Sequence, residues 1–217
     1  VCSVALHQNG TLISSRILHQ GQAHATHLAL LIDEVFNESA VDKKNIQAIA
    51  VSIGPGSYTG LRIGVSTAKG IAYALSVPVL AINTLAIMTV AVTQEQFKTA
   101  LRCPMIDARR MEVYCQLFSP AHCALNNVEA RVIDENSFRE VLDKEQVVFF
   151  GNGALKCEPL IQHSNAFFLP GVFPSAENMG VLALAKFNQG QTEDLFLLEP
   201  FYLKEFRIGK PATPLVG

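Results

Sequence analysis

The sequence has little charge and no excess of either sign: 17% of its 217 residues are charged, and the formal net charge is −2. A protein that grips nucleic acid broadly needs a basic stripe to neutralise phosphates. The composition therefore argues against broad RNA binding, and any RNA should be held mainly by a partner. A hydrophobic content of 49% is ample for a packed core in one large domain or two lobes.

Long apolar runs are also missing. The longest, residues 71–82, is interrupted by Ser76 and Pro78 and is shorter than the roughly 20 residues that a membrane-spanning helix needs. The N-terminus shows no basic segment, apolar signal core or cleavage site. We therefore expect a cytoplasmic protein without a membrane partner.

Metal-binding and disulfide patterns are absent as well. The five cysteines include no Cys-x-x-Cys pair, which fits neither a disulfide framework nor a zinc site, so we expect reduced, buried thiols. His24 and His27 share a helix face, but no third ligand follows nearby in the sequence. We expect no metal and no cofactor.

The pattern of apolar and turn residues predicts an α/β protein. Asn9-Gly10 separates two alternating segments and favours a β-hairpin. Helical spacing of apolar residues and short apolar runs define the other elements. Strands are predicted at residues 3–7, 11–18, 46–53, 79–82, 101–107, 112–118, 128–133 and 147–150, and helices at residues 24–38, 59–75, 85–92, 135–142, 154–162 and 175–188.

Strands followed by alternating helices and strands occur twice, which predicts two α/β lobes with mixed sheets. We divide the chain into residues 1–96 and residues 97–217, the second with an extended C-terminal arm. The first half has one strand fewer than the second. We therefore expect that an N-terminal strand is missing from the sequence.

The helix predicted from Thr59 has unequal sides. At 100° per residue, one polar stripe and one compact apolar side leave a further side that carries Gly60, Ile63, Gly64, Thr67, Gly70, Ile71 and Ala74. Each glycine costs a helix about 1 kcal/mol relative to alanine, so close packing must compensate. The glycines could admit the neighbouring helix of the same lobe or a helix of another molecule.

Phosphate binding is a third possibility, because Gly54-Pro55-Gly56-Ser57 leads into a helix N-terminus. The spacing matches neither the Walker loop nor the dinucleotide-binding fingerprint. Ser57 is more simply explained as the helix N-cap.

Residues 54–64, Gly-Pro-Gly-Ser-Tyr-Thr-Gly-Leu-Arg-Ile-Gly, closely resemble the signature of the bacterial TsaB proteins, also called YeaZ. Residues 2–6, 107–114, 151–154 and 200–203 extend the resemblance over nearly the whole chain. It implies two ribonuclease-H-like lobes of the actin/Hsp70/sugar-kinase (ASKHA) superfamily. It also implies a part in making threonylcarbamoyladenosine on the tRNA base 3′ of the anticodon.

The partners that the resemblance implies are a TsaD-type catalytic subunit, bound as a heterodimer, and a TsaE-type ATPase, with tRNA reached indirectly. Without its partner the chain could form a homodimer. The implied partner interface consists of His24, His27, Leu28, Leu31, Gly56, Thr59, Gly60, Ile63, Gly64, Thr67 and Ile71.

We expect a non-catalytic scaffold. An active kinase of this superfamily needs glycine turns that wrap phosphates, whereas Asp107-Ala108-Arg109-Arg110 places two bulky cations there. These arginines are either a solvated turn or a contact for RNA or an acidic partner. The alternative is an enzyme acting alone, either a nucleotide-dependent ASKHA protein or a peptidase, but Ser57 has no identifiable base.

Overall fold

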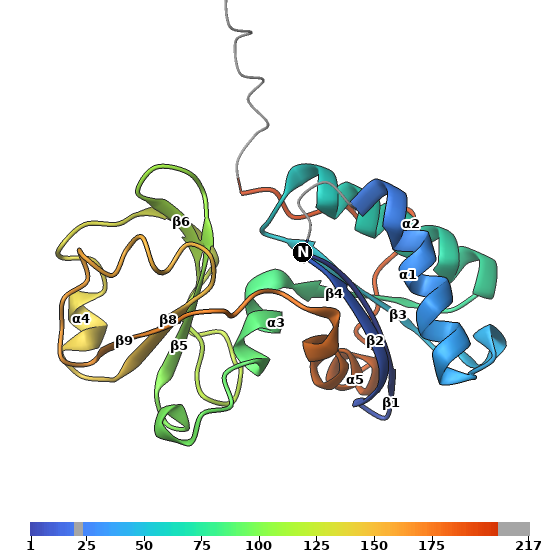
Figure 1. Cartoon of the computed structure of the whole chain (residues 1–217), viewed down its shortest axis with the longest axis horizontal. Helices are drawn as coiled ribbons and strands as arrows, with labels where there is room; N and C mark the ends of the chain where they lie inside the picture. The colour runs from blue at the N-terminus through green and yellow to red at the C-terminus, as the bar shows by residue number, and fades with distance from the viewer. Residues whose placement is uncertain (20–23, 204–217) are drawn as a thin grey trace, which may run out of the picture.

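The computed structural model describes residues 1–19 and 24–203, except for the side chains of residues 24–26. The strands form a β1–β2 pair, a β3–β4 pair and a five-stranded sheet. In Figure 1, α1 and α2 lie together on one side of the β1–β4 strands and α5 lies on the other side. The five-stranded sheet and α4 form the other half of the picture, and α3 lies between the two groups.

The N-terminal hairpin forms as predicted. Strands β1 (Cys2–Gln8) and β2 (Thr11–Leu18) are antiparallel, and Asn9 and Gly10 between them both have positive φ angles, 52° and 80°. Helix α1 (His24–Ser39) packs on both strands. Its buried residues Leu31 and Val35 face the core, which gives the helix its amphipathic spacing.

A parallel strand pair with a helix between its members follows. Strand β3 (Ile49–Gly54) pairs with β4 (Val79–Asn83), and α2 (Tyr58–Leu75) connects them. Ser57 is the N-cap of α2, because its side chain accepts a hydrogen bond from the Gly60 N–H. The cap predicted from the sequence is confirmed.

The five-stranded sheet has the order β7-β6-β5-β8-β9. Neighbours are antiparallel on the β7–β6–β5 side and parallel on the β5–β8–β9 side, so the sheet is mixed as predicted. Its strands are β5 (Leu101–Asp107), β6 (Glu112–Cys115), β7 (Glu129–Val132), β8 (Val147–Phe150) and β9 (Ala166–Leu169). All four residues of β8 are buried, as its uninterrupted apolar sequence indicates.

Three element predictions were wrong. Residues 154–160 form consecutive turns instead of the helix predicted at 154–162, because Pro159 lacks an N–H and its ring is incompatible with a preceding helical carbonyl. The helix predicted at residues 175–188 is split into the 3₁₀-helix η3 (Ala176–Met179) and α5 (Gly180–Asn188). Strand β9 was not predicted.

The remaining helical elements are short. Helix α3 (Thr84–Val90) agrees with the prediction in place and is slightly shorter. Helix α4 (Arg139–Leu142) is a single turn at the end of the segment predicted as helix. Two further 3₁₀-helices, η1 (Lys43–Asn45) and η2 (Glu95–Phe97), lie in connections.

The end of the described chain returns to the first half. The Glu193 N–H donates to the Val79 carbonyl at 2.9 Å, and the Phe201 N–H donates to the Ile53 carbonyl at 2.7 Å. Leu198 joins the buried cluster around Val65. The division at residues 96 and 97 stays a prediction, but residues 193–201 pack on elements of the first half.

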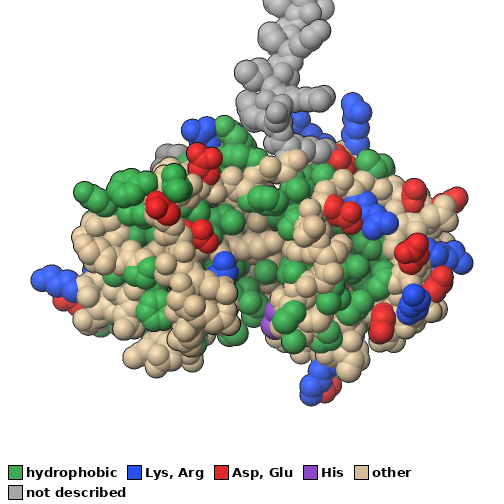
Figure 2. Space-filling model, turned by 180° about the vertical axis from the view of Figure 1, so that it is seen from behind, with side chains coloured by type: hydrophobic (Ala, Val, Ile, Leu, Met, Phe, Trp, Pro, Cys, Tyr) green, Lys and Arg blue, Asp and Glu red, His purple; other side chains and the backbone are tan. Residues whose placement is uncertain are grey.

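Charge is distributed evenly over the face seen in Figure 2. Lysine and arginine side chains are scattered among acidic ones, and a notch separates the two groups of elements. Within residues 1–19 and 24–203, no helix combines the length and apolarity needed to cross a membrane.

Candidate interface on α1 and α2

One side of α2 packs on the chain's own strands. Its buried residues are Leu61, Val65, Ala68 and Ala72. Val65, Ala68 and Ala72 share a cluster with Val51 of β3 and Val79 of β4. The sequence assigns Leu61, Val65, Ala68, Ala72 and Leu75 to the sheet side, and the structure buries all of them except Leu75, which is partly exposed.

The adjoining side of α2 carries three glycines. We call it the glycine face and define it as Thr59, Gly60, Ile63, Gly64, Thr67, Gly70 and Ile71. A Cβ atom added at Gly64 would meet only Val51 Cγ2, at 3.9 Å, and a Cβ atom at Gly70 would meet nothing within 4 Å. Both residues lie inside a helix, where alanine is more stable by about 1 kcal/mol.

Among residues 1–19 and 27–203, no side-chain contact accounts for either glycine. Contact at 3.9 Å is ordinary van der Waals packing, so no described side chain crowds Gly64. Helices α1 and α2 contact one another, but the described part of α1 does not approach closely at these two positions. A contact of these positions with another molecule stays a prediction.

The structure places most of the predicted interface residues at the surface. Thr59 and His27 are exposed, whereas Leu28, Gly56, Gly60, Ile63, Gly64, Thr67 and Ile71 are partly exposed. Leu31 has only 9% of its surface exposed and packs inward, whereas its neighbour Leu30 is 58% exposed. Leu30, which is not among the predicted interface residues, is thus the more exposed of the two. The side chain of His24, the first residue of α1, lies outside the described residues.

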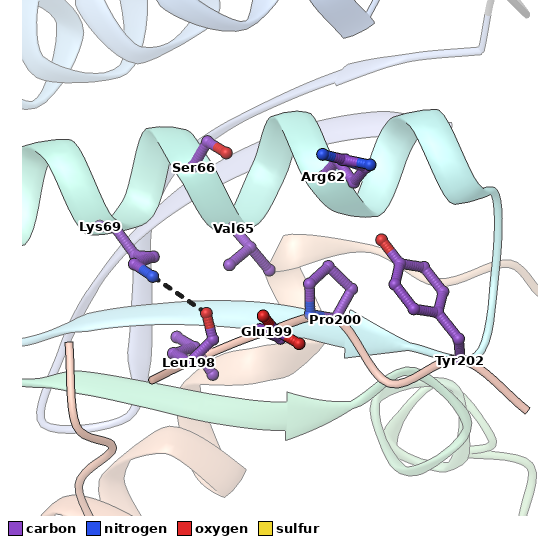
Figure 3. A pocket seen from close by; sticks show the side chains of 8 residues that line it. All are labelled: Arg62, Val65, Ser66, Lys69, Leu198, Glu199, Pro200 and Tyr202. Atoms are coloured by element: carbon purple, nitrogen blue, oxygen red, sulfur yellow. Dashed lines mark hydrogen bonds between the residues drawn. The ribbon is translucent and has the colours of Figure 1, made fainter. Parts of the chain in front are cut away.

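The polar stripe of α2, which includes Arg62, Ser66 and Lys69, contacts residues 196–202 of the same chain. Figure 3 shows the groove, of about 360 Å³, that Arg62, Ser66 and Lys69 line together with residues 198–200 and Tyr202. The Lys69 ammonium donates to the carbonyls of Phe196 at 3.2 Å and Leu198 at 3.1 Å. One cation of the stripe is thus engaged within the molecule.

Aromatic contacts close the other end of this groove. The rings of Tyr58 and Tyr202 lie 4.9 Å apart, and the Arg62 guanidinium donates to the Tyr58 hydroxyl at 2.6 Å. The tyrosine partner raises the pKa of Arg62, which keeps the side chain charged. Nothing in the local sequence pattern indicated this pairing across the chain.

Two glycines in turns of the chain are explained by internal contacts. Gly54 has φ +128°, and a Cβ atom there would lie 2.5 Å from the Phe201 carbonyl oxygen. At Gly153, a Cβ atom would lie 2.9 Å from the Asp107 backbone nitrogen. These glycines admit the chain's own backbone, so they give no support to a phosphate loop.

The turn between β5 and β6 is held by a lysine. The Lys156 ammonium makes a short hydrogen bond to the Asp107 carboxylate and donates to the carbonyls of Arg110 at 2.6 Å and Glu112 at 2.8 Å. An ammonium has three donors, and all three are used. Lys156 is also the main cause that lowers the pKa of Asp107.

The same turn carries two arginines with unusual backbone angles. Arg109 has φ 74° and Arg110 has φ 50°. Such left-handed conformations cost non-glycine residues about 1–3 kcal/mol each. The turn therefore persists because Lys156 and Asp107, which also accepts from the Arg109 N–H at 2.9 Å, hold it.

A buried arginine joins α3 to the five-stranded sheet. Arg102 on β5 is 7% exposed and donates to the Thr89 carbonyl at 3.0 Å and to His122 Nδ1 at 2.8 Å. His122 must present an unprotonated Nδ1 to accept this bond. Burial, and secondarily the Arg102 charge, lower the pKa of His122.

A family profile and the sequences of related proteins both connect this chain with threonylcarbamoyladenosine formation on tRNA. The profile of the family described as TsaD, tRNA N6-adenosine threonylcarbamoyltransferase, matches residues 11–190. The tRNA threonylcarbamoyladenosine biosynthesis protein TsaB of Escherichia coli (strain K12) is 27% identical over 209 residues, covering 94% of this chain and 90% of that protein. TsaB of Bacillus subtilis (strain 168) is 33% identical over 133 residues, 61% of this chain but only 56% of that protein.

Solved structures agree. A Pseudomonas aeruginosa protein described as similar to the peptidase YeaZ has a TM-score of 0.83 and 27% identity, and the likeness covers 94% of both chains. A second structure, YeaZ from the same organism, has a TM-score of 0.75. The chain therefore belongs to the TsaD family, and within that family it is of the TsaB/YeaZ type.

Proposed function

We propose that this chain is a non-catalytic subunit that pairs with a TsaD-type catalytic subunit in the formation of threonylcarbamoyladenosine on tRNA. The observation that carries the proposal is the glycine face, where Gly64 and Gly70 give up helix stability although the fold leaves room for side chains. A helix of another protein that approaches closely would require such a surface.

The proposed interface combines this face with α1. It includes His27, Leu28 and the exposed Leu30, while the buried Leu31 supports the helix from within. His24 and Gly56 complete the set at its margin. In the absence of the partner, the same surface would pair two copies of this chain.

The architecture proposed for the chain is a pair of ribonuclease-H-like lobes of the ASKHA type, residues 1–96 and 97–217. The β7-β6-β5-β8-β9 sheet, antiparallel and then parallel, supports this for the second lobe. The hairpin and the parallel β3–β4 pair support it for the first.

The proposed lack of catalysis has its own support. The β5–β6 turn, which should be a flexible glycine turn in a kinase of this fold, is fixed by Lys156 and carries Arg109 and Arg110. The proposed setting is cytoplasmic. A TsaE-type ATPase would join the complex, and the partner would supply most of the contact with tRNA.

The test is co-purification with a TsaD-type partner. Gly64→Leu and Gly70→Leu should weaken binding about tenfold to a hundredfold, since an added side chain would hold the helices apart. Gly70→Leu is the cleaner variant, because no atom lies within 4 Å of its Cβ position. Ala185→Leu, at an exposed position of α5, is the matched control and should bind normally.

Two results would contradict the proposal. Normal binding by both glycine variants would place the interface elsewhere. Hydrolysis of ATP or of a peptide by the purified chain, lost in Ser57→Ala or Asp107→Asn, would contradict the non-catalytic role.

A further inference from the structure

The β5–β6 turn carries two arginines at positions whose backbone conformation favours glycine. Arg109 and Arg110 follow one another with φ angles of 74° and 50°, a region that glycine adopts freely and that L-residues avoid. A Gly-Gly or Asn-Gly turn would close this hairpin without strain. The retained side chains therefore need a reason beyond the fold.

That reason is not a contact within the described chain. Across residues 1–19 and 24–203, neither guanidinium of the turn has a side-chain partner, and both residues are exposed. Every other arginine there has one. These pairs are Arg16 with Glu34 and Glu38, Arg62 with Tyr58, Arg102 with His122, Arg131 with Glu129, and Arg139 with Asp143.

The turn is also rigid and locally positive. Lys156 pairs with the Asp107 carboxylate, so this acid of the turn is already neutralised by another cation. The same ammonium holds the backbone of the turn through two carbonyl groups. The two guanidinium groups are thus presented from a fixed platform, which reduces the entropy lost when an anion binds.

We propose that the Arg109–Arg110 turn binds phosphate groups of an RNA backbone. A guanidinium donates two parallel hydrogen bonds to a phosphate, and adjacent arginines can reach successive phosphates of one strand. The proposal rests on the proposed function, which brings the chain to a tRNA. It adds a direct contact where composition alone predicted an indirect one.

An RNA fits the position better than an acidic protein does. The proposed partner interface lies on α1 and α2, whereas the turn joins strands of the five-stranded sheet in the other half of Figure 1. The charges on the face seen in Figure 2 are scattered and the formal net charge is −2, so the contact should be local and limited to about two phosphates. The phosphates of a free nucleotide share this chemistry and must be distinguished by experiment.

The experiment is a titration of fluorescently labelled tRNA with the complex of this chain and a TsaD-type partner, followed by anisotropy at several salt concentrations. The double variant Arg109→Gln with Arg110→Gln should bind at least about tenfold more weakly at low salt. Its slope of log affinity against log salt should fall by about 1.4–1.8, which corresponds to two lost phosphate contacts. The matched control, Lys98→Gln with Arg139→Gln, removes two exposed cations elsewhere and should change neither quantity.

A second variant separates binding from folding. Arg109→Gly with Arg110→Gly relieves the backbone strain, so its melting temperature should rise while its RNA affinity falls as in the glutamine variant. A purely structural role for the arginines would not produce these opposite changes.

Three results would overturn the proposal. The first is an unchanged salt slope in both arginine variants. The second is a loss confined to ATP or ADP binding, which would identify a nucleotide site. The third is a loss of the TsaD-type partner, which would identify an acidic protein surface. Because complex formation is measured first and the chain alone is titrated in parallel, failure of the proposed function is recognised separately.

Discussion

Alanine at two positions of the glycine face should stabilise the isolated chain. A Cβ atom at Gly70 would meet nothing within 4 Å, and one at Gly64 would make a single ordinary contact with Val51. Neither substitution introduces strain, so the gain is the helix propensity difference of about 1 kcal/mol per site. For a protein of this size, each should raise Tm by about 2–4 °C, and the pair by about 4–8 °C.

The measurement is thermal and urea unfolding of the single variants Gly64→Ala and Gly70→Ala and of the double variant. Ala185→Gly provides the reverse control. At this exposed position of α5, the change to glycine should lower the stability by about the 1 kcal/mol that each glycine-to-alanine change in α2 should add. Pull-down with a TsaD-type partner accompanies the unfolding curves. We expect stabilisation together with weaker binding, the trade-off seen where a site is kept for function.

A destabilised Gly64→Ala or Gly70→Ala variant would refute the reasoning. It would mean that each position is already filled within the folded chain, so that internal packing accounts for the glycine. A stabilised variant with unchanged partner binding would be a different failure. It would confirm that the folded chain has room for a side chain at these positions, and it would show that the partner does not bind this face of α2.

Three further predictions concern the five-stranded sheet. Gly153→Ala should destabilise the chain by about 1–3 kcal/mol in urea unfolding, because its Cβ would lie 2.9 Å from the Asp107 nitrogen. The pKa of Asp107 is lowered, chiefly by Lys156. The ionised carboxylate therefore stabilises the fold above about pH 4, and this stabilisation is lost as the pH falls through the pKa of the folded state. Lys156→Met should flatten that acid limb and lower stability at neutral pH, both read from unfolding curves at pH 2–7. The pKa of His122 is lowered by burial and by the Arg102 charge. The contribution of neutral His122 to the free energy of unfolding should therefore be complete above about pH 6.5 and decline below it. His122→Asn should remove this decline, which is measured as Tm from pH 5 to 8.

Local patterns predicted the elements whose causes are local. The bounds of β5 and β8 follow from apolar runs with clear ends, and the hairpin follows from Asn9-Gly10. The incorrect helix at residues 154–162 had the right spacing, but Pro159 outweighed it. Strand β9 is only four residues long and pairs with β8, so its identity depends on a partner distant in sequence.

The candidate interface shows the same division between local and distant causes. The two sides of α2 could be separated by counting 100° per residue, because its N-cap fixes where the helix begins. On α1 the count was less secure, and an error of one residue exchanges the exposed Leu30 for the buried Leu31. The contact of Lys69 with the carbonyl of Leu198 joins segments far apart in the chain, and no local pattern indicates it.

At both surfaces proposed for binding, the residue type differs from the one that the local backbone favours. At Gly64 and Gly70 the chain omits side chains that the helix would favour and the space would accept. At Arg109 and Arg110 it keeps side chains that the backbone disfavours. Where a residue serves only the fold, as Gly153 does, its type and its surroundings agree. Since natural sequences are otherwise locally consistent, a conflict without an internal explanation points outside the chain, and both conflicts occur at residues that the solvent or a partner can reach.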